Sequence, residues 1–321
     1  MTAQILSNCP TCGGSLSPFL DRVVDRLRPG ARLNFSYLKC GACGHVCLFP
    51  FPDSDEIASF YPQSFWRTSE SAERPSLLKR FEHWYRNRLM MRDFSLIRSR
   101  IRPGISLLDV GCSTGDFLMI CQNAGAKVKG IEFSPSAVEY CVKERKLDVA
   151  QGDLVTHDFG DERFDLITYN GVLEHVPNPF AHLRTCKRLL NPGGLVIVQG
   201  LPNLDSLGFR LKRQAWIGLD YPRHLHQFSI QSVRNLSKRA GYEIVSISTK
   251  SPRFNPPSLI ASFFPSLHRH KFDEYEARTG VNPKFRKGVL LLLMEAIRPL
   301  DWLLAQLRYG EHINMTLRPI H

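Results

Sequence analysis

From residue 104 onward, short apolar runs alternate with segments whose apolar residues recur at helical spacing. The apolar runs, typical of buried strands, are ISLLDVG (105–111), KVKGIEFS (127–134), FDLITYN (164–170) and LVIVQGL (195–201). Helical spacing occurs in DFLMICQNA (116–124), SAVEYCVKERK (136–146) and AHLRTCKRLL (181–190). Strands that alternate with helices in this way predict a parallel sheet whose crossover connections are right-handed.

Turn-forming residues divide these segments. Ser134-Pro135 is expected to open the second helix, and the tetrapeptide NPGG at 191–194 is expected to stop the third. A further helix over 228–240 ends at Gly241, and YEIVSISTK then predicts another strand.

The segment from Ser76 to Arg100 also has apolar residues at helical spacing. These are Leu77, Leu78, Phe81, Trp84, Tyr85, Leu89 and Phe94. We expect a helix that packs against the sheet, with a helix that caps the active site as the alternative. Residues 48–75, by contrast, contain four prolines and several aromatics, which is typical of a linker or a docking segment.

The carboxyl-terminal region has an apolar run from Val289 to Met294 that is interrupted by Glu295, Arg298 and Pro299. The run is too short to span a bilayer. Helices packed on their own domain, a dimer contact, a lid, or an amphipathic surface that lets 285–308 touch a membrane all fit the pattern. HINMTL (312–317) predicts the last strand.

These elements divide the chain into four parts. Residues 1–50 form a small module, 51–75 a linker, 76–250 an α/β core with an N-terminal capping helix, and 251–321 a helical insertion with a final edge strand. The expected fold is α/β, with a Rossmann-like seven-stranded sheet covered by helices on both faces.

Composition leaves this picture unchanged, but charge adds to it. Of 321 residues, 43% are apolar and 22% charged, as in ordinary globular proteins. The net charge of +12 is concentrated in 67–102 and 208–239, which favours an anionic partner. A nucleotide-linked substrate, nucleic acid and an acidic membrane surface all meet that description.

Five of the nine cysteines lie within 9–47, in two matching motifs. Cys9-Pro-Thr-Cys12 and Cys40-Gly-Ala-Cys43 each let two thiolates reach one tetrahedral ion, so together they predict a structural zinc ribbon. LNFSYLKC (33–40) alternates like a strand of that ribbon. Coincidental pairs of reduced cysteines, or ligation by His45 or Cys47, are the alternatives. The start of the chain lacks a signal-peptide pattern, so we expect a reducing, cytoplasmic setting, with membrane association as the alternative.

The first strand of the core ends in Asp109-Val-Gly111-Cys-Ser113-Thr-Gly115-Asp116, a turn of small residues that opens a helix. Such a turn brings backbone amides close to a ligand, although its spacing is not the GxGxxG of a dinucleotide site. Glu132 closes the second strand, where a carboxylate can accept the hydroxyls of a ribose. Asp153 follows a short third strand, and Asn170 ends the fourth.

LLDVGCSTGDFL, GIEFS, GDL, FDLITYNGVLEHVPNP and LLNPGGLVIVQG occur in this order over about 104–250. Together they resemble the motifs of class I S-adenosylmethionine-dependent methyltransferases. The resemblance implies S-adenosyl-L-methionine as cofactor. The residues expected to hold it are Asp109, Gly111, Cys112, Ser113, Gly115, Glu132, Phe133, Asp153, Leu154 and Asn170. Ser113 stands where many members of the family have glycine. The resemblance also implies that HINMTL (312–317) is the antiparallel edge strand with which the family ends its sheet.

LPNLDSLGFRLKRQAWIGLDYPRHLHQFS (201–229) further resembles the UbiG-like, methyltransferase type 23 branch, some members of which carry an N-terminal zinc ribbon. Histidine suits proton abstraction near neutral pH. His224 and His226 in PRHLHQF and His175 in LEHV are therefore the candidate bases, with loop anchoring or pocket lining as alternatives. Arg223 is a candidate partner for a substrate phosphate or a carboxylate.

The resemblance implies methyl transfer to a small-molecule acceptor, for example a sugar nucleotide or an intermediate of polysaccharide, lipid or natural-product synthesis. An RNA methyltransferase that grips nucleic acid with its ribbon and basic surface is a second hypothesis. A binding protein without catalysis is a third. The oligomeric state is left open.

Overall fold

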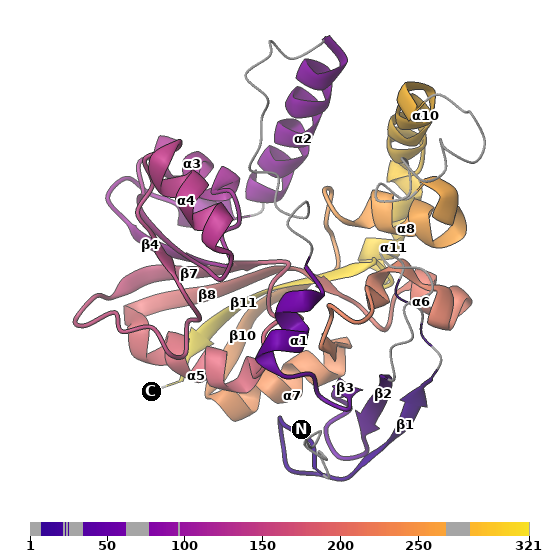
Figure 1. Ribbon diagram of the computed structural model, residues 1–321, viewed down its shortest axis with the longest axis horizontal. Coiled ribbons are helices and arrows are strands. Elements are labelled where there is room, and N and C mark those ends of the chain that lie inside the picture. Colours follow the sequence, from indigo (N-terminus) through magenta and orange to yellow (C-terminus); the bar gives the residue numbers. More distant parts are fainter. Residues whose placement is uncertain are drawn as a thin grey trace.

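The computed structural model describes residues 8–21, 23, 25, 35–61, 77–95, 97–267 and 283–320. The parts of the predicted linker and helical insertion at 62–75 and 268–282 lie outside the described residues. The rest forms a large sheet covered by helices and a smaller sheet beside it (Figure 1).

The large sheet has seven strands in the order β10-β11-β8-β7-β4-β5-β6, which confirms the expected α/β fold. Its strands are β4 (Ser106–Val110), β5 (Lys127–Glu132), β6 (Val149–Gln151), β7 (Phe164–Asn170), β8 (Leu190–Pro202), β10 (Tyr242–Ser248) and β11 (His312–Pro319). The five neighbouring strands β8, β7, β4, β5 and β6 pair in parallel. β11 is antiparallel to both β8 and β10.

Helices cover both faces of this sheet because successive strand residues point to opposite sides. The helices of the core are α3 (Asp116–Asn123), α4 (Pro135–Lys143), α5 (Pro179–Leu189), α6 (Leu207–Lys212) and α7 (Ile230–Ala240). Leu107 joins a core with residues of α3 and α4, whereas its neighbour Leu108 joins a core with residues of α5 and α7. Serine or asparagine caps begin α4, α5 and α7, and the cap of α4 is Ser134, as the sequence predicts.

Two strands differ from the expectation. β11 is not an edge strand, because it lies between β8 and β10, and the edge is β10. β11 buries residues on both of its faces, among them Met315 and Thr316, whereas β10 leaves four of its seven residues exposed. β8 also begins at Leu190, before the predicted NPGG stop, and its pairing with β7 shifts register between residues 190 and 195.

The ribbon (residues 1–50) contributes β1 (Leu16–Leu20), β2 (Ser36–Cys40) and β3 (Val46–Phe49), which pair antiparallel. A strand from the core, β9 (His226–Gln227), completes this small sheet by pairing with β3. α1 (Ser54–Ser59) follows, with a capping box at Asp53 and Glu56. The ribbon is therefore joined to the core by backbone pairing as well as by the chain itself.

Helix α2 (Leu77–Ser95) contacts two parts of the molecule. Tyr85 and Leu89 pack with residues of α8 (Asn255–Phe263) and α10 (Pro283–Ala296), whereas Phe94 packs into the core beside the sheet. α2 and α10 lie at the opposite end of the view from β1–β3 (Figure 1). α11 (Arg298–Gln306) then leads back to β11, and short 3₁₀ turns occupy 98–100, 213–215, 217–219 and 265–267. Among the described residues, the structure contains no helix with the length and apolar character needed to cross a bilayer.

Candidate active site

The turn at 111–115 follows β4 and can be built only from small residues. Gly111 and Gly115 both have positive φ, at 68° and 75°. A Cβ at Gly111 would lie 2.6 Å from a Val172 methyl, and one at Gly115 would lie 2.4 Å from a Leu147 methyl. Ser113 is also left-handed, with φ 51°. Because Gly111 and Gly115 have no side chains, the backbone of the turn stays accessible to a ligand.

Glu132 faces this turn from the end of β5. Its carboxylate accepts the Ser113 N–H at 2.8 Å and the Ser134 N–H at 2.9 Å. Burial raises the pKa of Glu132, whose exposed fraction is 3%. A carboxylate has about four acceptor positions, so these bonds do not fill all of them. The carboxylate and the turn therefore converge, as the sequence predicted, with acceptor capacity left over.

Asp109 lies beneath the turn and joins two strands. It accepts hydrogen bonds from the Thr168 hydroxyl at 2.6 Å and the Asn170 amide at 3.0 Å. Burial raises the pKa of Asp109 to about 7. Both partners belong to β7, so Asp109 fixes the ends of β4 and β7 against one another.

The other predicted cofactor residues occupy different environments. Phe133 is 59% exposed beside Glu132, whereas Cys112 and Leu154 have their side chains in the core and can offer a ligand only backbone. Asp153 bonds His182 Nε2 at 3.0 Å. Burial raises the pKa of Asp153, but the bond to His182 outweighs it, and the net pKa is lowered.

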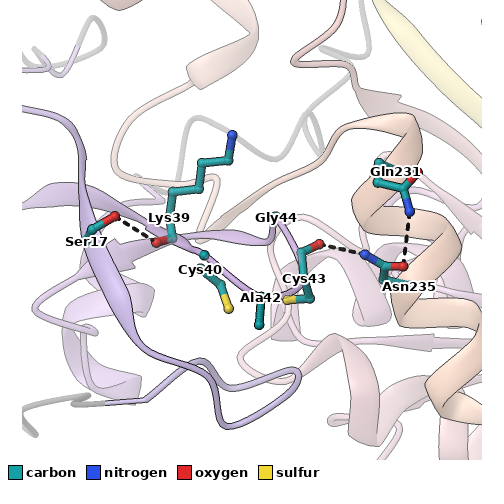
Figure 2. Close-up of a pocket in the computed structure, with 9 residues that line it drawn as sticks. Ser17, Lys39, Cys40, Ala42, Cys43, Gly44, Gln231 and Asn235 are labelled. Atoms are coloured by element: carbon teal, nitrogen blue, oxygen red, sulfur yellow. Dashed lines mark hydrogen bonds between the residues drawn. The ribbon is translucent and has the colours of Figure 1, made fainter.

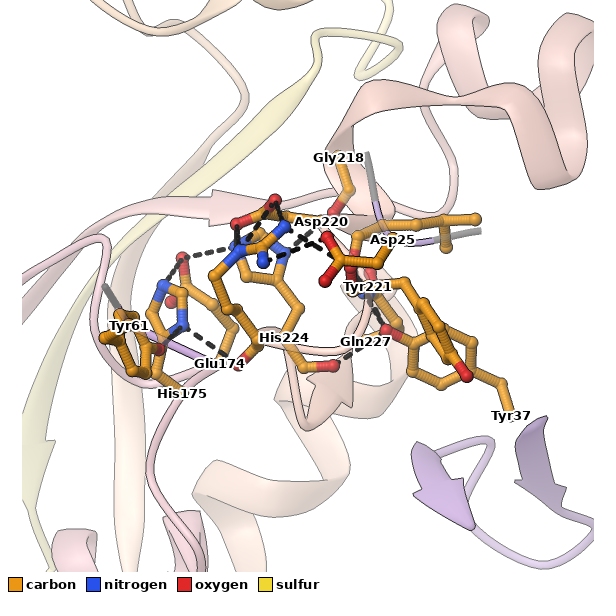
Figure 3. A network of polar contacts seen from close by, with 12 residues as sticks. Asp25, Tyr37, Tyr61, Glu174, His175, Gly218, Asp220, Tyr221, His224 and Gln227 are labelled. Carbon is orange, nitrogen blue, oxygen red and sulfur yellow. Dashed lines mark hydrogen bonds and ion pairs between the residues drawn. The ribbon is translucent and has the colours of Figure 1, made fainter. Parts of the chain in front are cut away.

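A second group of polar residues lies beyond the end of β7 (Figure 3). We call three of these residues, Glu174, His175 and His224, the Glu-His-His cluster. One carboxylate oxygen and one nitrogen of each ring lie within 4.8 Å of one another. The two imidazole rings meet edge-on, with centroids 4.6 Å apart. The structure thus brings together two of the three histidines singled out in the sequence.

The backbone determines which nitrogen of each ring carries hydrogen. His224 Nδ1 lies 2.8 Å from the Gly218 carbonyl, and His175 Nδ1 lies 3.0 Å from the Arg223 carbonyl. A carbonyl oxygen only accepts, so we assign the hydrogen to Nδ1 in both rings. Each Nε2 then carries a lone pair. The Nε2 atoms lie 3.9 Å (His175) and 4.0 Å (His224) from Glu174 Oε1, and His224 Nε2 also lies 3.9 Å from Asp220 Oδ2.

Burial sets the charges of this cluster. It raises the pKa of Glu174 to about 8, lowers the pKa of His175 to about 3, and lowers that of His224 as well. Glu174 Oε2 is buried with no hydrogen-bond partner among the described residues. Near neutral pH the two imidazoles are therefore uncharged proton acceptors, whereas Glu174 is a protonated carboxyl group that ionises as the pH rises through about 8.

Glu174, Tyr61 and Asp220 belong to this site but are not among the residues predicted from sequence. Tyr61 places its hydroxyl 2.9 Å from His175 Nδ1. Asp220 forms an ion pair with Arg223 at 2.8 Å, and its pKa is well below the usual range because the attraction of Arg223 outweighs burial. The adjacency of Glu174 to His175 in LEHV was an available signal, whereas no pattern points to Tyr61.

His226 lies apart from the Glu-His-His cluster. It is fully buried in β9, where its Nδ1 lies 2.9 Å from Nε2 of His45 in the ribbon. Burial lowers the pKa of His226 to about 4. Arg223, in turn, pairs with Asp25 and Asp220 and is 1% exposed, so the structure supplies its carboxylate partner within the chain.

Four sulfurs gather at one end of the ribbon, those of Cys9, Cys12, Cys40 and Cys43, within 4.8 Å of one another. The closest pairs are 3.4 and 3.6 Å apart. Thiolates about 2.3 Å from a tetrahedral zinc ion would be about 3.8 Å apart, close to these values. A Cβ at Gly14 would lie 3.1 Å from the Cys40 sulfur, so the second glycine after Cys12 leaves room for the group.

Helix α7 holds both cysteine motifs against the core. Asn235 donates to the Cys43 carbonyl at 2.9 Å, and Arg239 donates to the Thr11 carbonyl at 2.9 Å. A groove of about 650 Å³ runs between the second motif and α7, bordered by Lys39 and Gln231 (Figure 2).

Comparison with known proteins identifies several relatives. A methyltransferase domain family model matches residues 81–247. The ubiquinone biosynthesis O-methyltransferase of Azoarcus sp. is 30% identical over 171 residues, which cover 48% of this chain and 70% of that protein. The ubiquinone biosynthesis O-methyltransferase of Cereibacter sphaeroides (strain ATCC 17025) is 30% identical over 165 residues. The match covers 48% of this chain and 66% of that protein. Among solved structures, a magnesium protoporphyrin IX methyltransferase from Synechocystis PCC 6803 with bound SAH matches with a TM-score of 0.46 and 18% identity, covering 63% of this chain and 95% of that one.

Proposed function

This chain belongs to the methyltransferase domain family, and on that basis we propose that it transfers the methyl group of S-adenosyl-L-methionine to a hydroxyl of a small molecule. The observation that carries the proposal is the convergence of Glu132 on the turn at 111–115, with the Glu-His-His cluster beyond the next strand of the sheet.

The residues at the ends of β4 and β5 suit the cofactor. The amides of the 111–115 turn and of the start of α3 suit its methionine part. The free acceptor positions of Glu132 suit its ribose, and exposed Phe133 suits the face of its adenine. Asp153 lies at the same edge of the sheet, where ligands of α/β folds bind. When bound, the cofactor supplies an activated methyl group on a sulfonium.

The Glu-His-His cluster would receive the proton that a hydroxyl must lose during transfer. A free lone pair on Nε2 of His175 and of His224 suits this role, and an ionised Glu174 stabilises the imidazolium that forms. His226 is the third base proposed from sequence. Because it is buried against His45, we propose a structural role for it instead.

The acceptor class rests on the relatives, whose names describe O-methylation in ubiquinone biosynthesis. We propose a small hydroxylated acceptor, with RNA as the alternative favoured by the net charge of +12. Labelling an extract of the native cell with S-adenosylmethionine that carries an isotopic methyl group, followed by mass spectrometry of small molecules and RNA separately, separates the two. Label in RNA alone would overturn the small-molecule proposal, and absence of any cofactor binding by calorimetry would leave a binding protein without catalysis.

We also propose that the four cysteines of the ribbon hold a structural zinc ion. The short distances between their sulfurs support this, and four cysteine ligands close the coordination shell against any substrate. Metal analysis of the purified chain should find one zinc per molecule.

Peripheral membrane contact through 285–308 is a further part of the proposal. Within it, the large apolar side chains of Leu292, Trp302, Leu303 and Leu307 are each 48–74% exposed. Co-sedimentation with phosphatidylglycerol vesicles, compared between the parent and Trp302→Ala, tests it. Equal recovery of both proteins in the supernatant would exclude the contact.

A further inference from the structure

The ribbon contacts the elements that carry the Glu-His-His cluster, although no member of the cluster belongs to it. β9 pairs with β3 of the ribbon and lies within the same loop region as His224. Three side chains of the ribbon (Tyr37, His45 and Asp25) reach this region, and each does so at a different point (Figure 3 shows two of them).

The first contact holds the backbone of His224. Tyr37 lies in β2 and is fully buried. Its hydroxyl donates to the His224 carbonyl at 2.7 Å, with the Leu219 carbonyl 3.1 Å away, and accepts from Gln227 at 3.2 Å. The imidazole of His224 is thus tied at its ring by Gly218 and at its backbone by the ribbon.

The second contact passes through His226 to the turn that carries Glu174. His226 Nε2 lies 3.3 Å from the Pro177 carbonyl and must donate to it. His226 Nδ1 is then an acceptor, which takes the Nε2 hydrogen of His45, and His45 Nδ1 is left without a partner among the described residues. The His226 N–H also donates to the Glu174 carbonyl at 3.1 Å. One residue thus holds both ends of the turn 174–177, and the ribbon orients that residue.

The third contact acts on His175. Asp25 lies 3.2 Å from Nη1 of Arg223, and both side chains are fully buried. The carbonyl of Arg223 receives the Nδ1 hydrogen of His175. The orientation of His175 therefore depends on a residue that the ribbon anchors.

We propose that the ribbon is a positioning element of the active centre. Tyr37 and His45 hold the backbone of His224 and Glu174, the second through His226, and Asp25 holds Arg223, whose carbonyl orients the ring of His175. This inference rests on the proposed function, because it assigns the cluster a role in methyl transfer. Catalytic groups must keep their geometry to within about 0.5 Å. The ribbon therefore affects turnover without touching the cofactor.

Two tyrosine variants of the full chain test the first contact. Tyr37→Phe removes the hydroxyl that holds His224, and Tyr242→Phe is the matched control, since Tyr242 is also buried and donates to the Leu183 carbonyl at 2.8 Å away from the cluster. We expect the first variant to lower kcat for a catechol probe about tenfold, with unchanged affinity for S-adenosylmethionine by calorimetry. Long-range ¹H–¹⁵N spectra should show His224 losing its single Nδ1–H tautomer. The control should change neither kcat nor the histidine spectrum.

Two substitutions of His45 test the second contact. His45→Phe removes the donor to His226, whereas His45→Gln keeps an N–H that can reach it, so we expect loss of kcat in the first and recovery in the second. Equal effects of Tyr37→Phe and Tyr242→Phe, or equal effects of the two His45 variants, would overturn the positioning role. A parent protein that binds no S-adenosylmethionine, while the histidine spectrum still responds to Tyr37→Phe, would instead refute the proposed function and leave the contact intact.

Discussion

Glu174→Gln is expected to stabilise the fold at high pH and to slow the reaction. The substitution replaces a buried carboxyl group with an amide of the same shape, so packing is preserved. It acts on a residue that faces His175 and His224 on one side, with the Asp220–Arg223 ion pair nearby. The two expected effects have opposite signs and separate causes.

The stability effect follows from the pKa of Glu174, which burial raises from 4.5 to about 8. Between these values the folded chain holds a proton that the unfolded chain has released. The contribution of this group to stability is therefore complete below pH 4.5 and is lost as pH rises through 8. The difference corresponds to about 5 kcal/mol as an upper bound. Because glutamine cannot ionise, the variant should gain on the parent by a large part of that amount between pH 4 and pH 9.

The catalytic effect follows from the distance between Glu174 and the two Nε2 atoms, 3.9 and 4.0 Å. A unit negative charge at 4 Å stabilises an imidazolium by about 4 kcal/mol at an effective dielectric constant of 20. Losing it should lower kcat by about a hundredfold to a thousandfold. Because Glu174 must be ionised to act, kcat of the parent should rise with pH to about 8, and this rise should be absent from the variant.

Urea unfolding at both pH values, and kcat with a catechol probe from pH 6 to 9.5, measure the two effects. If Glu174→Gln lost the same amount of stability at pH 4 and at pH 9, the raised pKa assigned to the buried Glu174 carboxyl group would be refuted. A variant that keeps the kcat of the parent to within threefold would remove Glu174 from the mechanism. Loss of cofactor affinity would point to a general disturbance instead, so calorimetry with S-adenosylmethionine is the control.

Three further substitutions test other parts of the structure. Glu132→Ala should weaken S-adenosylmethionine binding by more than about tenfold in calorimetry, because it removes a charged acceptor, and unchanged affinity would exclude the ribose assignment. Gly115→Ala should lower stability by roughly 1–3 kcal/mol in urea unfolding, because its Cβ would meet a Leu147 methyl at 2.4 Å in a left-handed backbone, and a neutral result would contradict the described turn. Cys12→Ser should leave the chain without its zinc in metal analysis, whereas Cys186→Ser, in the core, should retain it.

Much of the core could be predicted from sequence because its signals are local. The turn at 111–115 and Glu132 each follow a strand, and parallel strands bring their carboxyl ends to one edge, so their convergence needs no knowledge of side-chain packing. The place of β11 could not be predicted in the same way. Its residue pattern shows that it is a strand, but not which strands lie on either side of it.

The histidine site illustrates a different limit. Residue type alone made His224 and His226 equivalent candidates, since they are two positions apart in one loop. Their environments differ because His226 forms a hydrogen bond with His45, which lies 181 positions earlier in the chain. The pKa of Glu174 likewise depends on how many chain segments bury it, which no local pattern encodes.

The pairing of β3 with β9 has a consequence for biosynthesis. His45 is made 181 residues before His226, its partner across the small sheet. At about 5–20 residues per second, the earlier strands wait roughly 10–40 seconds on the ribosome for the strand that completes them. During that interval the edge of β3 is an unpaired template for other chains.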